Sequence, residues 1–467
     1  MNLHRDILRL AVPSILANIT VPLVGMVDIA VAGHLGASGG ISAAALIGGI
    51  SIGSMLFDML YWNFGFLRGG TGGLTAQAYG RYHASSQEAS AAGVLEAETD
   101  IALTLKRALG IALSSGLALV ALQWVVVQVA FLLVECSPEV QALATQYFYI
   151  RIWAAPATLS LFAFKGWFIG MQDTVRPMVC DLLVNAVNIL LSIGLAFGYA
   201  GLPALGFAGV AYGTLIAQWT GFLYAAIAVR RRYGTFFRAH AANPVTKGRG
   251  LRAFFVLNRD LFLRSMCMIA VYIGFTMISA RYGDMMLAVG AILMKLLMIF
   301  SYFTDGFAYA GEALTGRFIG EGSHDGVMST IRQTFVWSLG VTGLFFLVYG
   351  VGGVPLLRLM TSDASVVEAG REFIPWLLLM PVIGCPAFTW DGIFTGATAS
   401  KDLRNSTAWC VVGFFGVWFA GIGLAKALLG TVPETLAIHI LMGAYFTHLA
   451  IRALYLTLRW RKAIPDA

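Results

Sequence analysis

The chain has 467 residues, of which 58% are hydrophobic and only 12% are charged, and its formal net charge is +7. A soluble domain keeps about a quarter of its residues charged, so this composition excludes a water-covered surface and indicates a lipid environment. Nucleic-acid binding is not expected, because the basic residues lie in short segments between apolar runs. The five cysteines follow neither a metal-binding nor a disulfide spacing.

The apolar runs predict an all-α membrane protein. Runs of about 20 residues can cross a ~30 Å hydrocarbon core as helices, and they lack the alternation typical of barrel strands. The first run follows MNLHRDILRL without a clear cleavage site, so we expect it to be retained as the first helix. In chain order, the twelve predicted membrane spans are 8–33, 43–68, 108–134, 142–170, 177–199, 205–229, 257–282, 285–316, 331–353, 372–398, 405–428 and 432–457.

The basic residues between these spans predict the orientation of the chain. With the N-terminus placed inside, only Arg281, Arg358, Arg371 and Lys426 fall in loops on the outer side, and most of the others fall inside. Cytoplasmic loops carry an excess of Lys and Arg. We therefore expect a multi-pass protein of a bacterial-type inner membrane with both termini in the cytoplasm.

Three sequence repeats divide the chain into two halves. The segment 230–256 is basic and contains Pro and Gly, and it is predicted to be a cytoplasmic linker between an N-terminal six-helix lobe (1–229) and a C-terminal one (257–467). Parallel repeats of six spans predict a pseudo-two-fold axis along the membrane normal and a central cavity between the lobes. The repeated pairs are RDILRL at 5–10 with RDLFLR at 259–264, LTAQAYG at 74–80 with LTGRFIG at 314–320, and FKGWFIGMQDT at 164–174 with WDGIFTGATAS at 390–400.

Asp28 is the first candidate functional residue, because it lies inside the first predicted span. Ionisable residues within a span usually face protein or water and are functional. Burial favours the protonated form of a carboxyl group, so such an acid can exchange protons. Pro13 and Pro22 each remove a backbone hydrogen bond and Gly25 adds little bulk, so this helix is expected to bend there as a hinge.

Three polar residues are expected at the depth of Asp28. Asn188 and Ser192 lie one turn apart in the outer half of the fifth span, and Thr214 lies at a similar depth in the sixth. The four residues are therefore predicted to form one polar layer. Asp181 lies close to the cytoplasmic end of the fifth span, where Arg176 is the expected partner.

The remaining charges within the spans have two interpretations. They form either buried ion pairs, such as Asp58 with Arg151, or a second proton relay in the C-terminal half. The sequence leaves both open for these residues: Asp58, Arg151, Lys295, Asp305, Glu312 and Asp391.

No motif of a phosphate loop, a metalloprotease helix or a nucleophile elbow occurs in the chain. An enzyme is therefore not predicted, and no cofactor or metal is expected. Transport driven by ATP would need a partner subunit.

Four segments together resemble the multidrug and toxic compound extrusion (MATE) transporters, in particular their DinF branch. They are FGFLRGGTGGLTAQAYG at 64–80, GWFIGMQDTVRP at 166–177, DGFAYAGEALTG at 305–316 and WDGIFTGAT at 390–398. The resemblance covers essentially the whole chain. It implies two six-helix lobes around a cavity, export of amphipathic and often cationic compounds in exchange for protons or sodium, and Asp28 as the coupling acid.

The resemblance also implies roles around Asp28. In some relatives the acid works with an Asn and an Asp on the fifth helix and a Thr on the sixth; Asn188 and Thr214 match, but Ser192 stands at the place of the second acid. One carboxylate among neutral oxygens compensates the charge of a hard cation poorly, which favours protons over sodium.

The predicted function is therefore a proton-coupled multidrug efflux transporter that works by alternating access, as a monomer in the lipid bilayer. The alternatives are a sodium-coupled antiporter, a flippase for lipids or lipid-linked sugars, and an intramembrane enzyme. The flippase is disfavoured because acids match the cations within the spans, and the enzyme because no His–Asp or Ser–His constellation is found. These cations are Arg68, Arg151, Arg264, Lys295 and Arg452.

Overall fold

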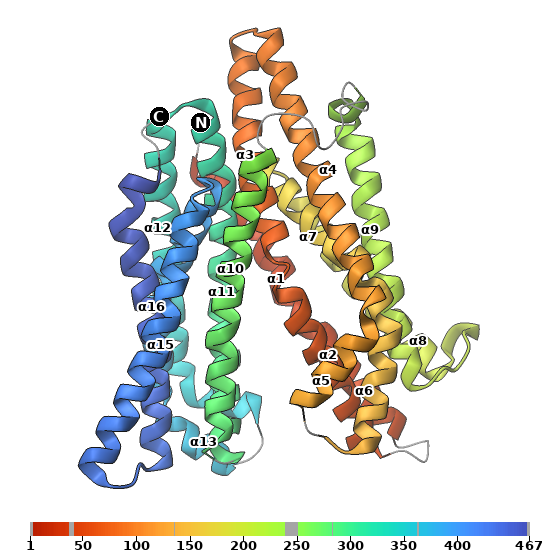
Figure 1. The fold of residues 1–467 in the computed structure, drawn as a ribbon, viewed down its shortest axis with the longest axis vertical. Coiled ribbons are helices and arrows are strands. Elements are labelled where there is room, and N and C mark those ends of the chain that lie inside the picture. Colours follow the sequence, from red (N-terminus) through yellow and green to blue (C-terminus); the bar gives the residue numbers. More distant parts are fainter. Residues whose placement is uncertain are drawn as a thin grey trace. The chain divides into compact units, whose positions relative to one another are not determined.

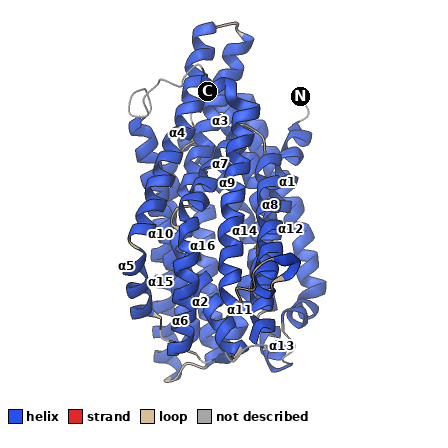
Figure 2. Ribbon diagram, turned by 90° about the vertical axis from the view of Figure 1, so that its right-hand side faces the viewer, coloured by secondary structure: helices blue, strands red, loops and turns tan. Residues whose placement is uncertain are grey.

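The computed structural model describes residues 3–36, 42–134, 136–238, 251–282, 284–361 and 364–464. Within these ranges every regular element is a helix and none is a strand (Figures 1 and 2). Twelve of the helical segments are long and apolar enough to cross a membrane. This confirms the prediction of an all-α protein with twelve spans.

The helices of the first half are α1 (Leu3–Gly36), α2 (Ala43–Trp62), α3 (Phe66–Gln87), α4 (Ala91–Ala121), α5 (Gln123–Leu133), α6 (Pro138–Arg151), η1 (Ile152–Ala154), α7 (Ala155–Gly170), α8 (Val175–Phe197), η2 (Tyr199–Gly201) and α9 (Phe207–Arg238). Several predicted spans consist of consecutive helices. The tight η1 turn, for example, joins α6 to α7 within one span, just before Pro156.

The helices of the second half are α10 (Leu251–Ala280), α11 (Asp284–Glu321), α12 (His324–Met360), α13 (Ala364–Arg371), α14 (Ile374–Gly396), α15 (Ser400–Leu429) and α16 (Glu434–Ala463). Most of them form one candidate span each, and the short α13 precedes α14. These candidate spans follow one another in the order predicted from hydropathy.

The chain divides into two compact units, which we call the N-terminal unit (Leu16–Leu251) and the C-terminal unit (Met1–Ile15 with Arg252–Ala467). The predicted lobes differ from these units at the start of the chain, because the beginning of α1 packs with the C-terminal unit. Gly306 of α11, for instance, lies against Ile15, where an added Cβ would stand 2.4 Å from the Ile15 side chain.

Helices extend into the predicted linker at 230–256 from both ends. α9 continues as a helix to Arg238, and α10 begins at Leu251. The rest of the predicted linker, 239–250, lies outside the described residues. The hydropathy pattern missed these ends because a helix that leaves the bilayer keeps its backbone hydrogen bonds although its side chains become polar.

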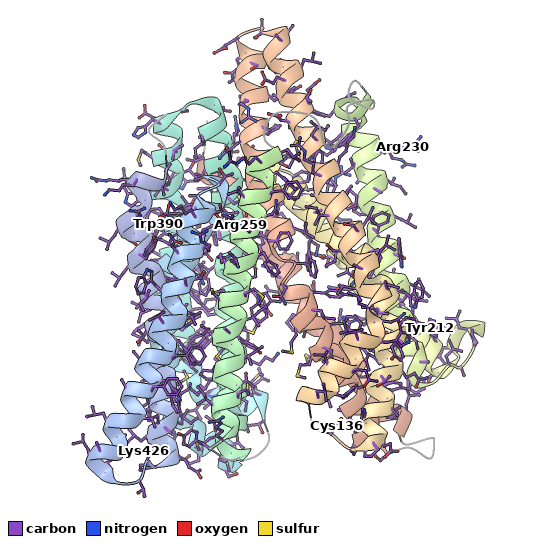
Figure 3. The ribbon with its side chains drawn as sticks, in the orientation of Figure 1. Cys136, Tyr212, Arg230, Arg259, Trp390 and Lys426 are labelled. Carbon is purple, nitrogen blue, oxygen red and sulfur yellow. The ribbon has the colours of Figure 1, made fainter. Side chains whose placement is uncertain are left out.

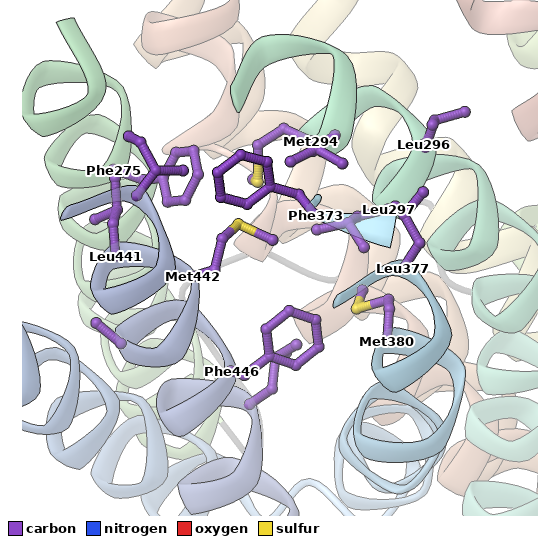
Figure 4. Packing of buried hydrophobic residues seen from close by; sticks show 14 of the residues in the cluster. Phe275, Met294, Leu296, Leu297, Phe373, Leu377, Met380, Leu441, Met442 and Phe446 are labelled. Atoms are coloured by element: carbon purple, nitrogen blue, oxygen red, sulfur yellow. The ribbon is translucent and has the colours of Figure 1, made fainter. Parts of the chain in front are cut away.

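Each unit has its own apolar core. In the C-terminal unit, Phe275, Leu297, Leu377 and Leu441 are buried in one cluster formed by α10, α11, α14 and α16 (Figure 4). In the N-terminal unit, a second cluster joins α1, α2, α6 and α9 around Tyr147. Both cores therefore hold together helices that lie far apart in the sequence.

Glycines bring corresponding helices into backbone contact in both units. A Cβ added to Gly166 of α7 would lie 2.0 Å from the Arg68 carbonyl oxygen of α3, and one added to Gly392 of α14 would lie 2.0 Å from the Ala308 carbonyl oxygen of α11. Such close approach requires residues without a side chain. The same packing thus occurs at matching positions of the predicted repeat.

The turns that follow α7 and α14 also share one conformation. Gln172 and Thr398 have positive φ angles of 58° and 54°. Just after them, Asp173 N donates to Phe168 O and Ala399 N donates to Phe394 O, each at about 2.9–3.0 Å. This agreement supports the repeat between 164–174 and 390–400.

Candidate functional site

Asp28 lies on α1 in the N-terminal unit and is only 4% exposed. Its carboxyl group interacts with the Ser192 hydroxyl of α8. Its Oδ1 atom is buried and accepts no hydrogen bond from any residue in the described part of the chain. Burying a carboxylate is costly unless it is paired, so this acid is in a state that gaining a proton would relieve.

The polar neighbours of Asp28 are linked through one backbone carbonyl. Ser192 Oγ and Thr214 Oγ1 both donate to Val210 O, at 3.5 and 3.2 Å, and Asn188 Nδ2 donates to Thr214 Oγ1 at 2.8 Å. The structure therefore brings Asp28, Asn188, Ser192 and Thr214 into one buried layer formed by α1, α8 and α9, as the depth argument predicted.

The local sequence explains why this layer can form. Gly213 precedes Thr214 on α9, and a Cβ there would lie 2.6 Å from the Ser192 backbone nitrogen. The missing side chain lets α9 approach α8 closely enough for the hydroxyl and amide groups to meet. A second buried oxygen, Asn188 Oδ1, also has no hydrogen-bond partner among the described residues. The layer thus presents two acceptor oxygens without donors.

Arg151 provides a cation close to this layer. Its Nη1 atom donates to Tyr147 Oη at 3.1 Å and to Ser54 Oγ at 3.4 Å, and its guanidinium lies 4.7 Å from the centre of the Phe57 ring. It interacts electrostatically with Asp28 and Asp58.

The predicted hinge residues lie on a helix that is continuous in the structure. α1 stays helical through Pro13 and Pro22. A Cβ added to Gly25 would meet no described atom within 4 Å. The bending of α1 at these positions stays a prediction.

The C-terminal unit contains a different arrangement around Asp391. Arg264 of α10 and Arg452 of α16 both donate to Asp391 Oδ2. Trp390, labelled in Figure 3, donates from Nε1 to Thr457 Oγ1 at 2.9 Å and thereby ties α14 to α16. Asp391 is thus held between two guanidinium groups. The sequence shows the three charges but does not predict these pairs, because the pairs join helices that are distant in the sequence.

The other charges of the candidate network are distributed over both units. Ser301 Oγ donates to Asp305 Oδ2 at 3.5 Å, and Glu312 is fully buried on α11. Lys295 is exposed on α11 and Asp58 on α2. Whether they form a second relay stays open.

The predicted partner of Asp181 is wrong. Asp181 Oδ1 lies 2.5 Å from Lys165 Nζ on α7, and Arg176 pairs with Asp173 at 3.7 Å instead. The reason is lateral packing: α7 runs beside α8, and Asp181 faces it, whereas Arg176 points to the turn between the two helices.

One polar contact near the layer was missed by sequence reasoning. Asn185 Nδ2 of α8 donates to Thr20 Oγ1 of α1 at 2.8 Å. Asn185 lies one turn before Asn188, so the helical spacing of the two amides was the available signal. This bond ties α8 to α1 two turns from Asp28.

Among the described residues, no group of three or more His, Cys, Asp or Glu side chains is placed to hold a metal ion.

Comparison with known proteins adds the family. The MatE family model matches residues 96–193 and 261–418. The chain is 33% identical over 456 residues to DNA damage-inducible protein F of Escherichia coli, covering 97% of this chain and 91% of that protein. The chain belongs to the MatE family.

MatE proteins are membrane transporters, and the enzyme alternative is thereby set aside. A probable multidrug resistance protein NorM from Thermotoga maritima is 23% identical over 297 residues, which covers 62% of this chain and 61% of that protein. The Vibrio cholerae MATE transporter VcmN in its bent form has the same fold, with a TM-score of 0.79 at 18% identity, covering 99% of this chain and 97% of that one. The fold expected from the resemblance is confirmed.

Proposed function

We propose that the chain is a multidrug efflux transporter that exchanges amphipathic, cationic compounds for protons, with Asp28 as the coupling acid. The observation that carries this proposal is the state of Asp28: a carboxyl group that is 4% exposed, has the Ser192 hydroxyl beside it, and keeps one oxygen without a donor among the described residues. The similarity to a multidrug resistance protein supports the substrate class.

A proton on Asp28 relieves the unsatisfied oxygen of this layer. With Asp28 ionised, the unsatisfied oxygen is costly in apolar surroundings; with Asp28 protonated, its hydroxyl can donate to a neighbouring acceptor such as Asn188 Oδ1. Since α1 carries Asp28, each protonation state favours its own packing of α1 against α8 and α9. The two states bias alternating access in opposite directions.

A sodium ion fits the layer less well. Its ligands would be one carboxylate and the neutral oxygens of Asn188, Ser192 and Thr214. The positive charge of Arg151, which acts on Asp28, would repel the ion. The charge bias of the loops supports placement in a bacterial inner membrane with both termini in the cytoplasm.

The test is Asp28→Asn in inside-out membrane vesicles. With an acidic vesicle interior, the wild type accumulates a dye cation, and Asp28→Asn is expected to lose essentially all proton-driven uptake because it cannot exchange a proton. Asp100→Asn is the control, since Asp100 belongs to an exposed pair with Arg81.

Each gradient is imposed separately. Uptake by the wild type under a sodium gradient at equal pH would identify sodium as the coupling ion. Full proton-driven uptake by Asp28→Asn would refute the role of Asp28.

A further inference from the structure

Arg151 is a cation that interacts electrostatically with Asp28, and it is held in place by contacts from two helices. Tyr147, four residues earlier on α6, and Ser54 on α2 both accept from its Nη1 atom. The Tyr147 side chain is fully buried and packs against Gly53 and against the Phe207 ring of α9. The guanidinium therefore cannot leave its position without disrupting the core.

The core that holds Arg151 is the core that holds Asp28. Val31 and Ala32, one turn beyond Asp28 on α1, belong to the same buried cluster as Phe57 and Tyr147. No residue in the described ranges forms an ion pair with Asp28, so Arg151 acts across a gap rather than through a bond.

The charged and titratable groups around Arg151 come from three helices. They are Asp28 of α1, Asp58 and Tyr61 of α2, and Tyr147 of α6. With both acids ionised and both tyrosines neutral, the formal charges of Asp28, Asp58 and Arg151 sum to −1. Without Arg151 the same residues would carry −2 and would attract a cation more strongly.

We propose that Arg151 is the fixed counter-cation of Asp28, and that its positive charge weakens sodium binding at this site. The inference rests on the proposed function of Asp28 and extends it to the choice of coupling ion. The guanidinium opposes the binding of any cation to Asp28, a proton included, but a proton forms a covalent O–H bond with the carboxyl oxygen that outweighs this cost. A sodium ion would have to stay beside Asp28 as a second positive charge facing the guanidinium.

Direct sodium binding to purified protein tests this inference separately from transport. Thermal unfolding is measured above neutral pH in sodium chloride and in choline chloride of equal ionic strength. The wild type is expected to show no sodium-specific shift of its unfolding temperature. Arg151→Gln is expected to show such a shift, with apparent sodium affinity raised about tenfold or more by removal of the repulsion. The double variant Asp28→Asn with Arg151→Gln is expected to lose it again.

Two controls separate charge from structure. Arg151→Lys keeps the positive charge and should therefore remain insensitive to sodium. If Arg151 had only a structural role, its charge would not matter and Arg151→Lys would not be expected to differ from Arg151→Gln in its response to sodium. Arg176→Gln removes a cation that pairs with Asp173 and lies outside the layer, and it should behave like the wild type.

A folded Arg151→Gln protein without a sodium shift would overturn the inference. If that variant does not fold, the wild type decides: sodium-specific stabilisation that disappears in Asp28→Asn would also overturn it. Failure of the proposed function would be recognised by a different result. The wild type would take up no dye under a proton gradient, while its unfolding temperature would respond to sodium as expected above.

Discussion

The two units share a backbone pattern but place acids within their spans in different electrostatic settings. In the N-terminal unit, Asp28 lies beside a serine hydroxyl and forms no ion pair with any described residue. In the C-terminal unit, Arg264 and Arg452 both donate to Asp391 Oδ2, although Asp391 Oδ1, like Asp28 Oδ1, has no donor among the described residues. A proton relieves a buried carboxylate that lacks an ion pair, whereas neutralising an acid between two arginines would leave the two guanidinium groups facing each other. We therefore expect proton exchange in the first unit and a structural ion cluster in the second.

The charge difference extends to matching positions of the repeat. Lys165 of α7 corresponds in the aligned repeats 164–174 and 390–400 to Asp391 of α14. Lys165 pairs with Asp181 of the next helix, and Asp391 pairs with arginines from α10 and α16. The repeat thus keeps a charge at this position but inverts its sign, so packing is conserved between the units while electrostatics are not.

The largest expected effect comes from neutralising Asp391. Asp391→Asn leaves two guanidinium groups facing each other, one of them on the 2% exposed side chain of Arg452. Breaking a buried pair in this way costs about 3–5 kcal/mol. The free energy of unfolding, measured in detergent by thermal or denaturant unfolding, should fall by that amount.

Asp28→Asn provides the matched comparison. It is expected to change the free energy of unfolding by less than about 1 kcal/mol, because Asp28 has no ion pair to lose. Equal destabilisation by the two variants would break the comparison between the units.

A smaller loss of stability than that of Asp391→Asn is expected where glycines bring helices together. Gly166→Ala and Gly392→Ala each place a Cβ 2.0 Å from a backbone carbonyl oxygen, of Arg68 and Ala308 respectively. Overpacking of this kind costs about 1–3 kcal/mol, and backbone atoms cannot move aside as a side chain can. The two variants should lower the unfolding temperature by similar amounts.

Gly416→Ala in α15 is the control, since no described atom lies within 4 Å of the added Cβ. A large loss for Gly392→Ala with none for Gly166→Ala would show that the shared packing carries different weight in the two units.

The smallest effect is expected at the two matching turns. Gln172→Gly and Thr398→Gly relieve positive φ angles of 58° and 54°, and each should stabilise the protein by up to about 1 kcal/mol. Thr398→Gly should gain more, because a β-branched residue tolerates this conformation least. The unfolding temperature of each variant is the measurement.

The opposite change, Gly322→Ala at a φ angle of 69°, should destabilise by a comparable amount. Destabilisation by both glycine variants would mean that the side chains of Gln172 and Thr398 contribute more through their contacts than their strained backbone costs.

Counting residues along helices was enough to assemble the polar layer. Asn188, Ser192 and Thr214 were assigned to the depth of Asp28 because a helix rises about 1.5 Å per residue and the spans begin at recognisable boundaries. The bonds between Asn188, Thr214 and Val210 agree with that assignment. The depth of a residue in the membrane follows from its position along its own helix, and the hydropathy pattern locates the ends of that helix.

Lateral partners could not be predicted in the same way. Asp181 has Lys165 rather than Arg176 as its partner, and Asp391 has arginines from two distant helices. Which faces of two helices meet depends on rotation and packing, and a single sequence contains no signal for either. The position of Met1–Ile15 in the C-terminal unit was missed for the same reason.

The sequence by itself determined that this protein is a helical membrane protein with twelve spans, a repeated design and a buried acid at position 28. The physical reason is that lipid requires long apolar helices and makes every buried charge conspicuous. Only the tertiary structure decided which charges neutralise one another. Among the described residues, that choice leaves Asp28 without an ion pair and gives Asp391 two arginines, because contacts between helices are set by packing that no local pattern records.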